Sequence, residues 1–182
     1  MAFLGRDRWP SLVSGLVAKV MASGPVLIGF DGSDASAHAV REAGALLGPR
    51  DALVVVVWEP DAAYQVAAVP MIPLSLTPVA VDVGRAMEVE KELYAGAQEM
   101  AQQGADVARE AGFEAEPLVV ADVLSVPETL VRVADERDAQ TIVVGASGRG
   151  GLSELLLGST SRGVIKRATR PVVVVRQFAA RD

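Results

Sequence analysis

Five short apolar runs, separated by segments with helical periodicity, constrain the fold of this chain more than any other feature. Each run is rich in valine or other large apolar residues and has the length of a buried strand: residues 25–30, 51–58, 114–120, 141–145 and 172–175. Between them, apolar residues recur at the spacing of an amphipathic helix. Strands that alternate with helices in this way predict an α/β fold, with helices on both faces of a parallel sheet.

The first helical segment, residues 34–47, has clear signals at both ends. Ser33 or Asp34 can cap its N-terminus, and Gly48 followed by Pro49 ends it. Its expected buried face consists of Ala37, Val40, Gly44 and Leu47.

Two further helices are predicted later in the chain. An imperfect apolar face predicts a long helix from about Arg85 to Ala111. Ser125-Val-Pro-Glu128 has the pattern of a capping box, and Pro127 is allowed in the first turn of a helix. The helix that follows is expected to turn Leu130, Val133 and Ala134 inward.

Glycine and hydroxyl residues are concentrated between the last two apolar runs. Gly145, Gly148, Gly150 and Gly151 follow one run, and Gly158-Ser159-Thr160-Ser161 stands where the next helix should begin. Glycines allow the main chain to approach a ligand closely, and turned N–H groups can bind an anion. A helix N-terminus adds free donors and partial positive charge. Two such donor clusters suit a di- or triphosphate, although a plain connection with an ordinary N-cap has the same composition.

This loop does not match the general nucleotide or hydrolase motifs. A Walker loop needs Lys after Gly150, where Gly151 stands. A dinucleotide fingerprint that begins at Gly145 needs glycine where Ser147 stands. A nucleophile elbow centred on Ser147 needs glycine in place of Arg149.

Asp31 lies directly after the first apolar run, at the carboxyl end of a predicted strand. Open α/β sheets bind ligands at this edge, where a carboxylate can accept hydrogen bonds from a ribose hydroxyl or an adenine amine. The sequence Asp31-Gly-Ser33 is equally typical of a turn. His38, the only histidine, has no partner in the pattern of a catalytic triad.

Composition narrows the class of protein. With 182 residues, 51% hydrophobic and 22% charged, the chain is expected to be globular, with one domain plus extensions. Its net charge of −6 leaves no basic surplus for binding nucleic acid. The absence of cysteine excludes disulfides and thiolate sites and fits a reducing compartment, so we expect a cytoplasmic protein. No apolar run reaches the ~18 residues of a membrane span.

The domain is expected to occupy residues 25–178, between an extension at 1–24 and a tail at 179–182. Within the extension, Pro10 to Met21 has the periodicity of an amphipathic helix. Residues 59–86 form a long, apolar, proline-broken loop, which either covers a ligand or packs on a partner subunit.

The pattern Gly145-x-x-Gly148, nine residues, then Gly158-Ser159 resembles the ATP-binding signature of the universal stress protein family. The flanking sequences GRGGLSELLLGSTSR and RPVVVVR are also similar to that family, and the resemblance covers roughly Pro25 to Arg176. It implies a Rossmann-like, five-stranded parallel sheet in the order 3-2-1-4-5, sandwiched by helices. Strands one and four then adjoin at the topological switch, where Asp31 and Gly145 would meet in one crevice.

The ATP-binding branch of this family implies a set of contact residues. Asp31 would mark the adenosine site, and backbone atoms near Val57 would contact the adenine edge. Contacts to the phosphates and ribose would come from Gly145, Ala146, Gly148, Arg149, Gly158, Ser159, Thr160 and Ser161. Mg²⁺ would be held through the phosphates, since no cluster of carboxylates offers a protein metal site. The family also dimerises through its last strand, here Val172 to Val175, which implies a homodimer.

Three functions are compatible with these observations. The first is an ATP-binding sensor or interaction module in the stress response, with an unknown client protein. The second is a slow ATP hydrolase or another nucleotide-processing enzyme on the same scaffold. The third is an ATP-free, chaperone-like partner protein. No general base or triad is visible, so weak ATPase activity is the most that the sequence predicts, and no catalytic residue is assigned.

Overall fold

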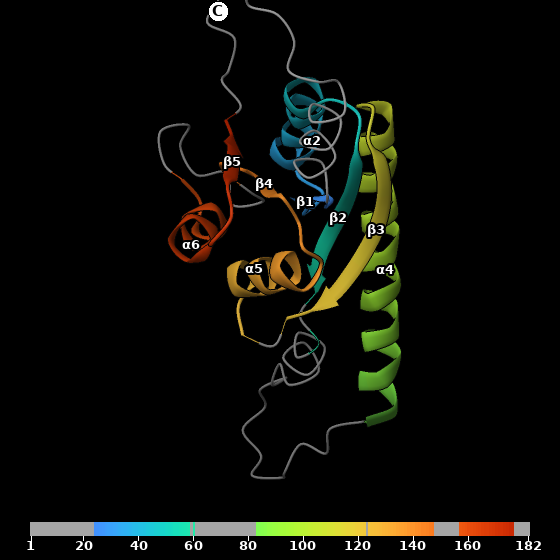
Figure 1. Cartoon of the computed structure of the whole chain (residues 1–182). Coiled ribbons are helices and arrows are strands. Elements are labelled where there is room, and N and C mark those ends of the chain that lie inside the picture. The colour runs from blue at the N-terminus through green and yellow to red at the C-terminus, as the bar shows by residue number, and fades with distance from the viewer. Residues whose placement is uncertain (1–23, 59, 61–82, 123, 148–156, 177–182) are drawn as a thin grey trace, which may run out of the picture.

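The computed structural model describes residues 24–58, 60, 83–122, 124–147 and 157–176. Within them, strands and helices alternate along the chain (Figure 1). The elements are β1 (Val26–Gly29), α2 (Asp34–Leu47), β2 (Asp51–Trp58), α4 (Val83–Glu110), β3 (Glu114–Ala121), α5 (Val126–Glu136), β4 (Thr141–Gly145), α6 (Ser159–Arg167) and β5 (Val172–Val175). The predictions for the 1–24 extension, most of the 59–86 loop and the 179–182 tail concern residues outside this description.

All five strands are parallel and lie in the order β3-β2-β1-β4-β5, as the sequence predicts. The chain runs from β1 outward to β2 and β3, then crosses back to place β4 on the other side of β1 and β5 beyond it. The strand order therefore reverses between β1 and β4, and this reversal is the topological switch of an open α/β sheet.

Each face of the sheet is covered by two helices, with a separate apolar core beneath each pair (Figure 1). Even-numbered residues of β1 and β2, such as Ile28 and Val54, are buried beneath α2 and α4. Odd-numbered neighbours, such as Leu27 and Val55, are buried beneath α5 and α6. Successive side chains of a strand point to opposite faces, so a strand covered on both faces must be continuously apolar. This requirement explains the valine runs.

The ends and faces of the helices differ from the predictions in two places. The long helix begins at Val83 and ends at Glu110, so residues 83–86 belong to α4 instead of the loop. The buried face of α2 is broader than expected and includes Ser36, Ala39 and Ala43, whereas Ala37 and Leu47 are only half-buried. The broader face follows from the position of α2, which packs against both the sheet and α4.

The predicted capping box at the start of α5 does not form. The Ser125 hydroxyl donates to Oε2 of Glu128 at 2.9 Å, and neither side chain caps a backbone N–H. Both carboxylate oxygens of Glu128 are instead engaged by side chains, since Arg167 of α6 donates to Oε1 at 3.0 Å. Leu130, Val133 and Ala134 are buried, as expected, and Pro127 stands in the first turn.

Helix α2 packs so closely against the C-terminal end of α4 that only glycine fits at one contact, with Ala111, the residue that follows α4. A methyl group built on Gly44 would overlap the carbonyl oxygen of Ala111 and lie 2.8 Å from the Ala111 Cβ. At Gly96, inside α4, the described residues beyond the helix's own neighbouring backbone place no atom within 4 Å of the same methyl position. The two positions therefore separate the packing role of glycine from its effect on helix propensity.

We expect Gly44→Ala to destabilise the protein and Gly96→Ala to stabilise it. Both substitutions improve helix propensity by about 1 kcal/mol, but only the first creates an overlap, which typically costs about 1–3 kcal/mol. Urea denaturation of both variants measures the free energies of unfolding. Equal stabilisation of the two variants would contradict the close contact between α2 and α4.

Candidate functional site

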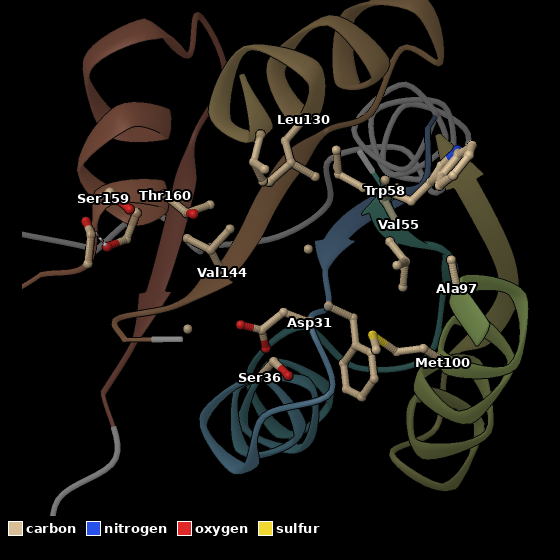
Figure 2. Close-up of a pocket in the computed structure, with 18 of the residues that line it drawn as sticks. Asp31, Ser36, Val55, Trp58, Ala97, Met100, Leu130, Val144, Ser159 and Thr160 are labelled. Atoms are coloured by element: carbon tan, nitrogen blue, oxygen red, sulfur yellow. Dashed lines mark hydrogen bonds between the residues drawn. The ribbon is translucent and has the colours of Figure 1, made fainter. Parts of the chain in front are cut away.

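A cavity of about 700 Å³ lies at the carboxyl edge of the sheet (Figure 2). Its walls come from the ends of β1, β2 and β4, from one side of α4, and from the N-terminal parts of α5 and α6. The volume falls within the range of small-molecule sites, roughly 300–1,000 Å³. The cavity therefore lies at the topological switch, where this class of sheet binds ligands.

Val57 directs its backbone polar groups into this cavity. The N–H of Phe30 donates to the Val55 carbonyl at 2.9 Å, and pairing between β1 and β2 ends with Gly29 opposite Val55. Alternate residues of a parallel strand direct N–H and C=O to the same neighbour. Val57 therefore directs both groups toward the β1 side, past the last paired residue of β1. The next residue, Trp58, faces the other way: its carbonyl accepts from the N–H of Asp122 at 2.7 Å, on the β3 side.

Gly145 does the same from the opposite wall. The N–H of Ile142 donates to Pro171 at 3.0 Å and that of Ala146 to Val175 at 2.7 Å, so the even-numbered residues face β5. Gly145 consequently faces β1, whose pairing with β4 ends at Ile28 opposite Val143. Neighbouring strands on both sides of β1 thus present main-chain groups where the β1 ladder has stopped.

The carboxylate of Asp31 is held in place by a turn. Its Oδ1 accepts from the N–H and the hydroxyl of Ser33, at 3.0 and 2.6 Å. Gly32 between them has φ 78°, a left-handed conformation that favours glycine. Ser33 also caps α2 by accepting from the N–H of Ser36 at 3.1 Å. Asp31 therefore forms the turn that its sequence suggests and also lines the cavity.

The N-terminus of α6 forms the polar end of the cavity. Gly158 is the N-cap and donates its N–H to the Ala146 carbonyl at 2.7 Å, which ties the helix start to the end of β4. Because glycine has no side chain, no side-chain oxygen of this N-cap accepts from the first turn, and the first backbone N–H groups of an α-helix have no acceptor within it. The start of α6 therefore carries partial positive charge and suits an anion.

The three hydroxyls at this end have different environments. Ser161 is buried, with 1% exposure, and its hydroxyl bonds to the carbonyls of Ala146 and Gly158, each at 3.1 Å. Ser159 is exposed and Thr160 half-buried, and both line the cavity. Ser161 thus maintains the shape of the turn, while the other two hydroxyls face the cavity (Figure 2).

The opposite end of the cavity is largely apolar, with Glu92 of α4 as a charged residue in its lining. Trp58 meets Tyr94 edge to face, with ring centroids 5.5 Å apart, and Ala97 and Met100 of α4 lie nearby (Figure 2). Sequence analysis did not predict the contribution of α4, nor that of Leu130 from α5. An apolar helix face was the only available signal, and it does not distinguish a cavity wall from ordinary core.

One cavity brings together most of the predicted contact residues from four separate stretches of chain. The cavity is lined by Asp31, Val57, Gly145, Ala146, Gly158, Ser159, Thr160 and Ser161. Gly148 and Arg149 lie outside the described residues. The roles assigned to all ten in ATP binding stay predictions.

An ion pair between Arg167 and Glu128 joins α6 to α5. The pKa of Glu128 is lowered below its ordinary value, first by the hydrogen bond from the Ser125 hydroxyl and next by that from the Arg167 guanidinium.

In the described parts of the chain, no three His, Asp or Glu side chains gather as a metal site. The helices of those same segments include none with the length and apolar character needed to cross a membrane.

Comparison with known proteins gives matches to one family. The model of the universal stress protein family matches residues 23–176. A universal stress protein of Methanocaldococcus jannaschii is 33% identical over 66 residues, 36% of this chain and 40% of the relative. One from Mycobacterium tuberculosis is 51% identical over 45 residues, 25% of this chain and 15% of the relative. The matched segments thus span less than half the length of these curated relatives.

Solved structures share the fold over most of the chain. The M. jannaschii protein superposes with a TM-score of 0.66 at 20% identity, over 87% of this chain and 99% of the other. A universal stress protein from Archaeoglobus fulgidus in complex with dAMP has a TM-score of 0.55 at 23% identity, over 85% and 99%. Another universal stress protein, in complex with cAMP, has 0.50 at 26%, over 85% and 98%. The family match over residues 23–176, together with the shared fold, shows that this chain belongs to the universal stress protein family.

Proposed function

We propose that this universal stress protein binds ATP in the cavity at the topological switch. The observation that carries the proposal is the convergence of three kinds of group there. Main-chain polar groups come from Val57 and Gly145, a fixed carboxylate comes from Asp31, and a helix N-terminus comes from α6. Two members of the family with this fold form complexes with the adenine nucleotides dAMP and cAMP, which supports an adenine nucleotide here as well.

The adenosine part fits the end near β2 and α4. The backbone N–H and C=O of Val57 offer one donor and one acceptor, which match the ring nitrogen and the exocyclic amine on one edge of adenine. Apolar walls that include Trp58 and Met100 suit the faces of the base. Asp31 lies between this end and α6 (Figure 2), where its carboxylate can accept from a ribose hydroxyl.

The phosphates fit the N-terminus of α6. The N–H groups of the first turn and the hydroxyls of Ser159 and Thr160 are donors suited to phosphate oxygens. Gly148 and Arg149 are predicted to contribute from the adjoining loop. Mg²⁺ would bridge the phosphates without a protein ligand, since this ion commonly binds through phosphates and water.

Binding is favoured over rapid turnover. Among the described residues that line the cavity there is no histidine, lysine or cysteine, and the carboxylates there are Glu92 and Asp31, whose Oδ1 already accepts from the N–H and hydroxyl of Ser33. We therefore propose a nucleotide-dependent sensor or interaction module in the stress response, located in the cytoplasm, with an unidentified client. The alternatives are a slow ATP hydrolase and an ATP-free, chaperone-like protein. Steady phosphate release from ATP would favour the first alternative, and failure to bind ATP would favour the second.

Substituting Ser159 tests the phosphate assignment. We expect Ser159→Asp to weaken ATP binding at least about tenfold, because a carboxylate at the start of α6 repels the phosphates. Adenosine affinity should change less than about twofold, since its contacts lie elsewhere. Calorimetric titration of both ligands gives the two dissociation constants.

The control is Ser159→Asn, which has nearly the same size and shape as Asp but no charge. It should change ATP affinity by no more than about threefold. An acidic residue also favours the start of a helix, so the Asp variant should be no less stable than the wild type. Equal ATP affinity of the Asp and Asn variants would be incompatible with phosphates at this helix.

Substituting Asp31 tests the ribose assignment separately. Asn can still accept from Ser33 and keep the turn, so Asp31→Asn removes the charge while preserving the local backbone. We expect affinities for ATP and adenosine to fall together by about tenfold, the typical effect of losing one charge-assisted hydrogen bond. The same titration measures both. Unchanged adenosine affinity in this variant would contradict contact between Asp31 and the ribose.

We also propose that the chain forms a homodimer through β5. This strand is an edge of the sheet, and its four valines are half-buried within a single chain. The carbonyls of Pro171 and Val175 face β4, so the strand alternation directs the N–H groups of Val172 and Val174 away from the sheet. An apolar edge with outward donors is suited to pairing with a second copy.

Replacing one outward-facing residue tests this dimer. Val174→Pro removes an outward N–H while leaving the β4 ladder intact, and we expect it to convert a dimer into a monomer. Val174→Ala, which keeps the N–H, should remain dimeric. Light scattering at micromolar concentration separates the chain mass of 19.0 kDa from twice that value. A monomeric wild type, or a Pro variant that remains dimeric, would refute pairing through this edge.

A further inference from the structure

Helices α5 and α6 are in contact at a position where only glycine fits. A methyl group built on Gly163 of α6 would lie 2.5 Å from Cγ and 2.7 Å from Cβ of Pro127 in α5. Real side-chain contacts do not occur at such distances, so a larger residue would have to push the helices apart. The proline ring is rigid and cannot move aside independently of its own backbone.

An ion pair clamps the same two helices one turn further along α6. Nε of Arg167 lies 3.0 Å from Oε1 of Glu128, the residue that follows Pro127. The Ser125 hydroxyl holds the other oxygen of this carboxylate at 2.9 Å. This exposed ion pair adds little stability of its own, so the contact at Gly163 is what limits how closely α5 and α6 approach.

Helix α5 is itself held against the ligand cavity. Val126 and Leu130 line the cavity, and Leu130 is buried, with 1% exposure. A methyl group on Gly29, at the end of β1, would lie only 3.2 Å from Cδ1 of Leu130, which shows how closely α5 approaches this strand. A continuous series of contacts therefore runs from the end of β1 through α5 to α6.

We propose that Gly163, through its contact with Pro127, positions the N-terminus of α6 for polyphosphate binding. This inference rests on the proposed ATP site. Gly163 stands four residues after Ser159, about 6 Å along the helix, so a displacement at the contact carries the N-terminal N–H groups with it. Hydrogen bonds weaken steeply when donor and acceptor move beyond about 3.2 Å, and a shift of a few tenths of an ångström is therefore significant.

The base and ribose contacts do not share this dependence. Val57 belongs to β2, and Asp31 is fixed by its own turn at the start of α2. Neither is attached to α6. Gly163 therefore controls the preference for ATP over adenosine without controlling the affinity for adenosine.

The test compares affinities of ATP and adenosine across a small set of variants. Gly163→Ala should weaken ATP about tenfold, equivalent to losing roughly one hydrogen bond to a charged group, and change adenosine less than about twofold. Ile165→Ala changes an exposed side chain of the same helix that does not line the cavity, and it should leave the ratio unchanged.

Rescue distinguishes positioning from general damage. Combining Gly163→Ala with Pro127→Gly removes the atoms that the new methyl meets, so most of the lost preference for ATP should return. Either of two results would overturn the inference alone: an unchanged ratio in Gly163→Ala, whether or not both ligands weaken, or no recovery in the double variant. A wild type that binds ATP no better than adenosine would overturn the inference together with the phosphate site.

Discussion

The position of the cavity depends on where the hydrogen-bonded pairing of β1 with β2 and β4 ends. Because β1 lies at the centre of the sheet and pairs for only a few residues, its longer neighbours extend past it at the carboxyl edge. The polar backbone of Val57 on one side and of Gly145 on the other then has no continuing strand between them. Burial of backbone polar groups without partners is costly, so such an edge favours a ligand, water or side chains that supply hydrogen bonds. The cavity occupies this position.

The other parts of the site are extensions of the same constraint. The turn at Asp31 takes the chain away from the end of β1 into α2, and the tie from Gly158 to Ala146 brings the start of α6 back to the end of β4. Both turns are held by hydrogen bonds of backbone groups and short side chains, and these bonds fix the geometry of the turns. Helix α5 packs against α6 and, through Pro127 and Gly163, limits how closely α6 approaches it. The proposed nucleotide site is thus a property of the main chain more than of exposed charged side chains.

Much of this arrangement could be predicted from the sequence. Valine runs and helix caps determine the elements, and the boundaries of α2 and β2 agree with the predictions. The resemblance to a known family supplied the strand order, which periodicity alone does not give. What could not be predicted depends on contacts between distant segments. The expected capping box does not form, and Glu128 pairs instead with Arg167, 39 residues away. Met100 and Leu130 line the cavity, but their sequence pattern is that of core residues, because an apolar cavity wall and a packed core use the same side chains.

Amide NMR of ¹⁵N-labelled protein, titrated first with adenosine and then with ATP, tests the central claim most directly. The account predicts that adenosine shifts the resonances of Val57 and its neighbours, and that ATP additionally shifts Thr160 and Ser161 at the start of α6. Shifts confined to residues away from the carboxyl edge of the sheet, or no shifts at millimolar ATP, would contradict it.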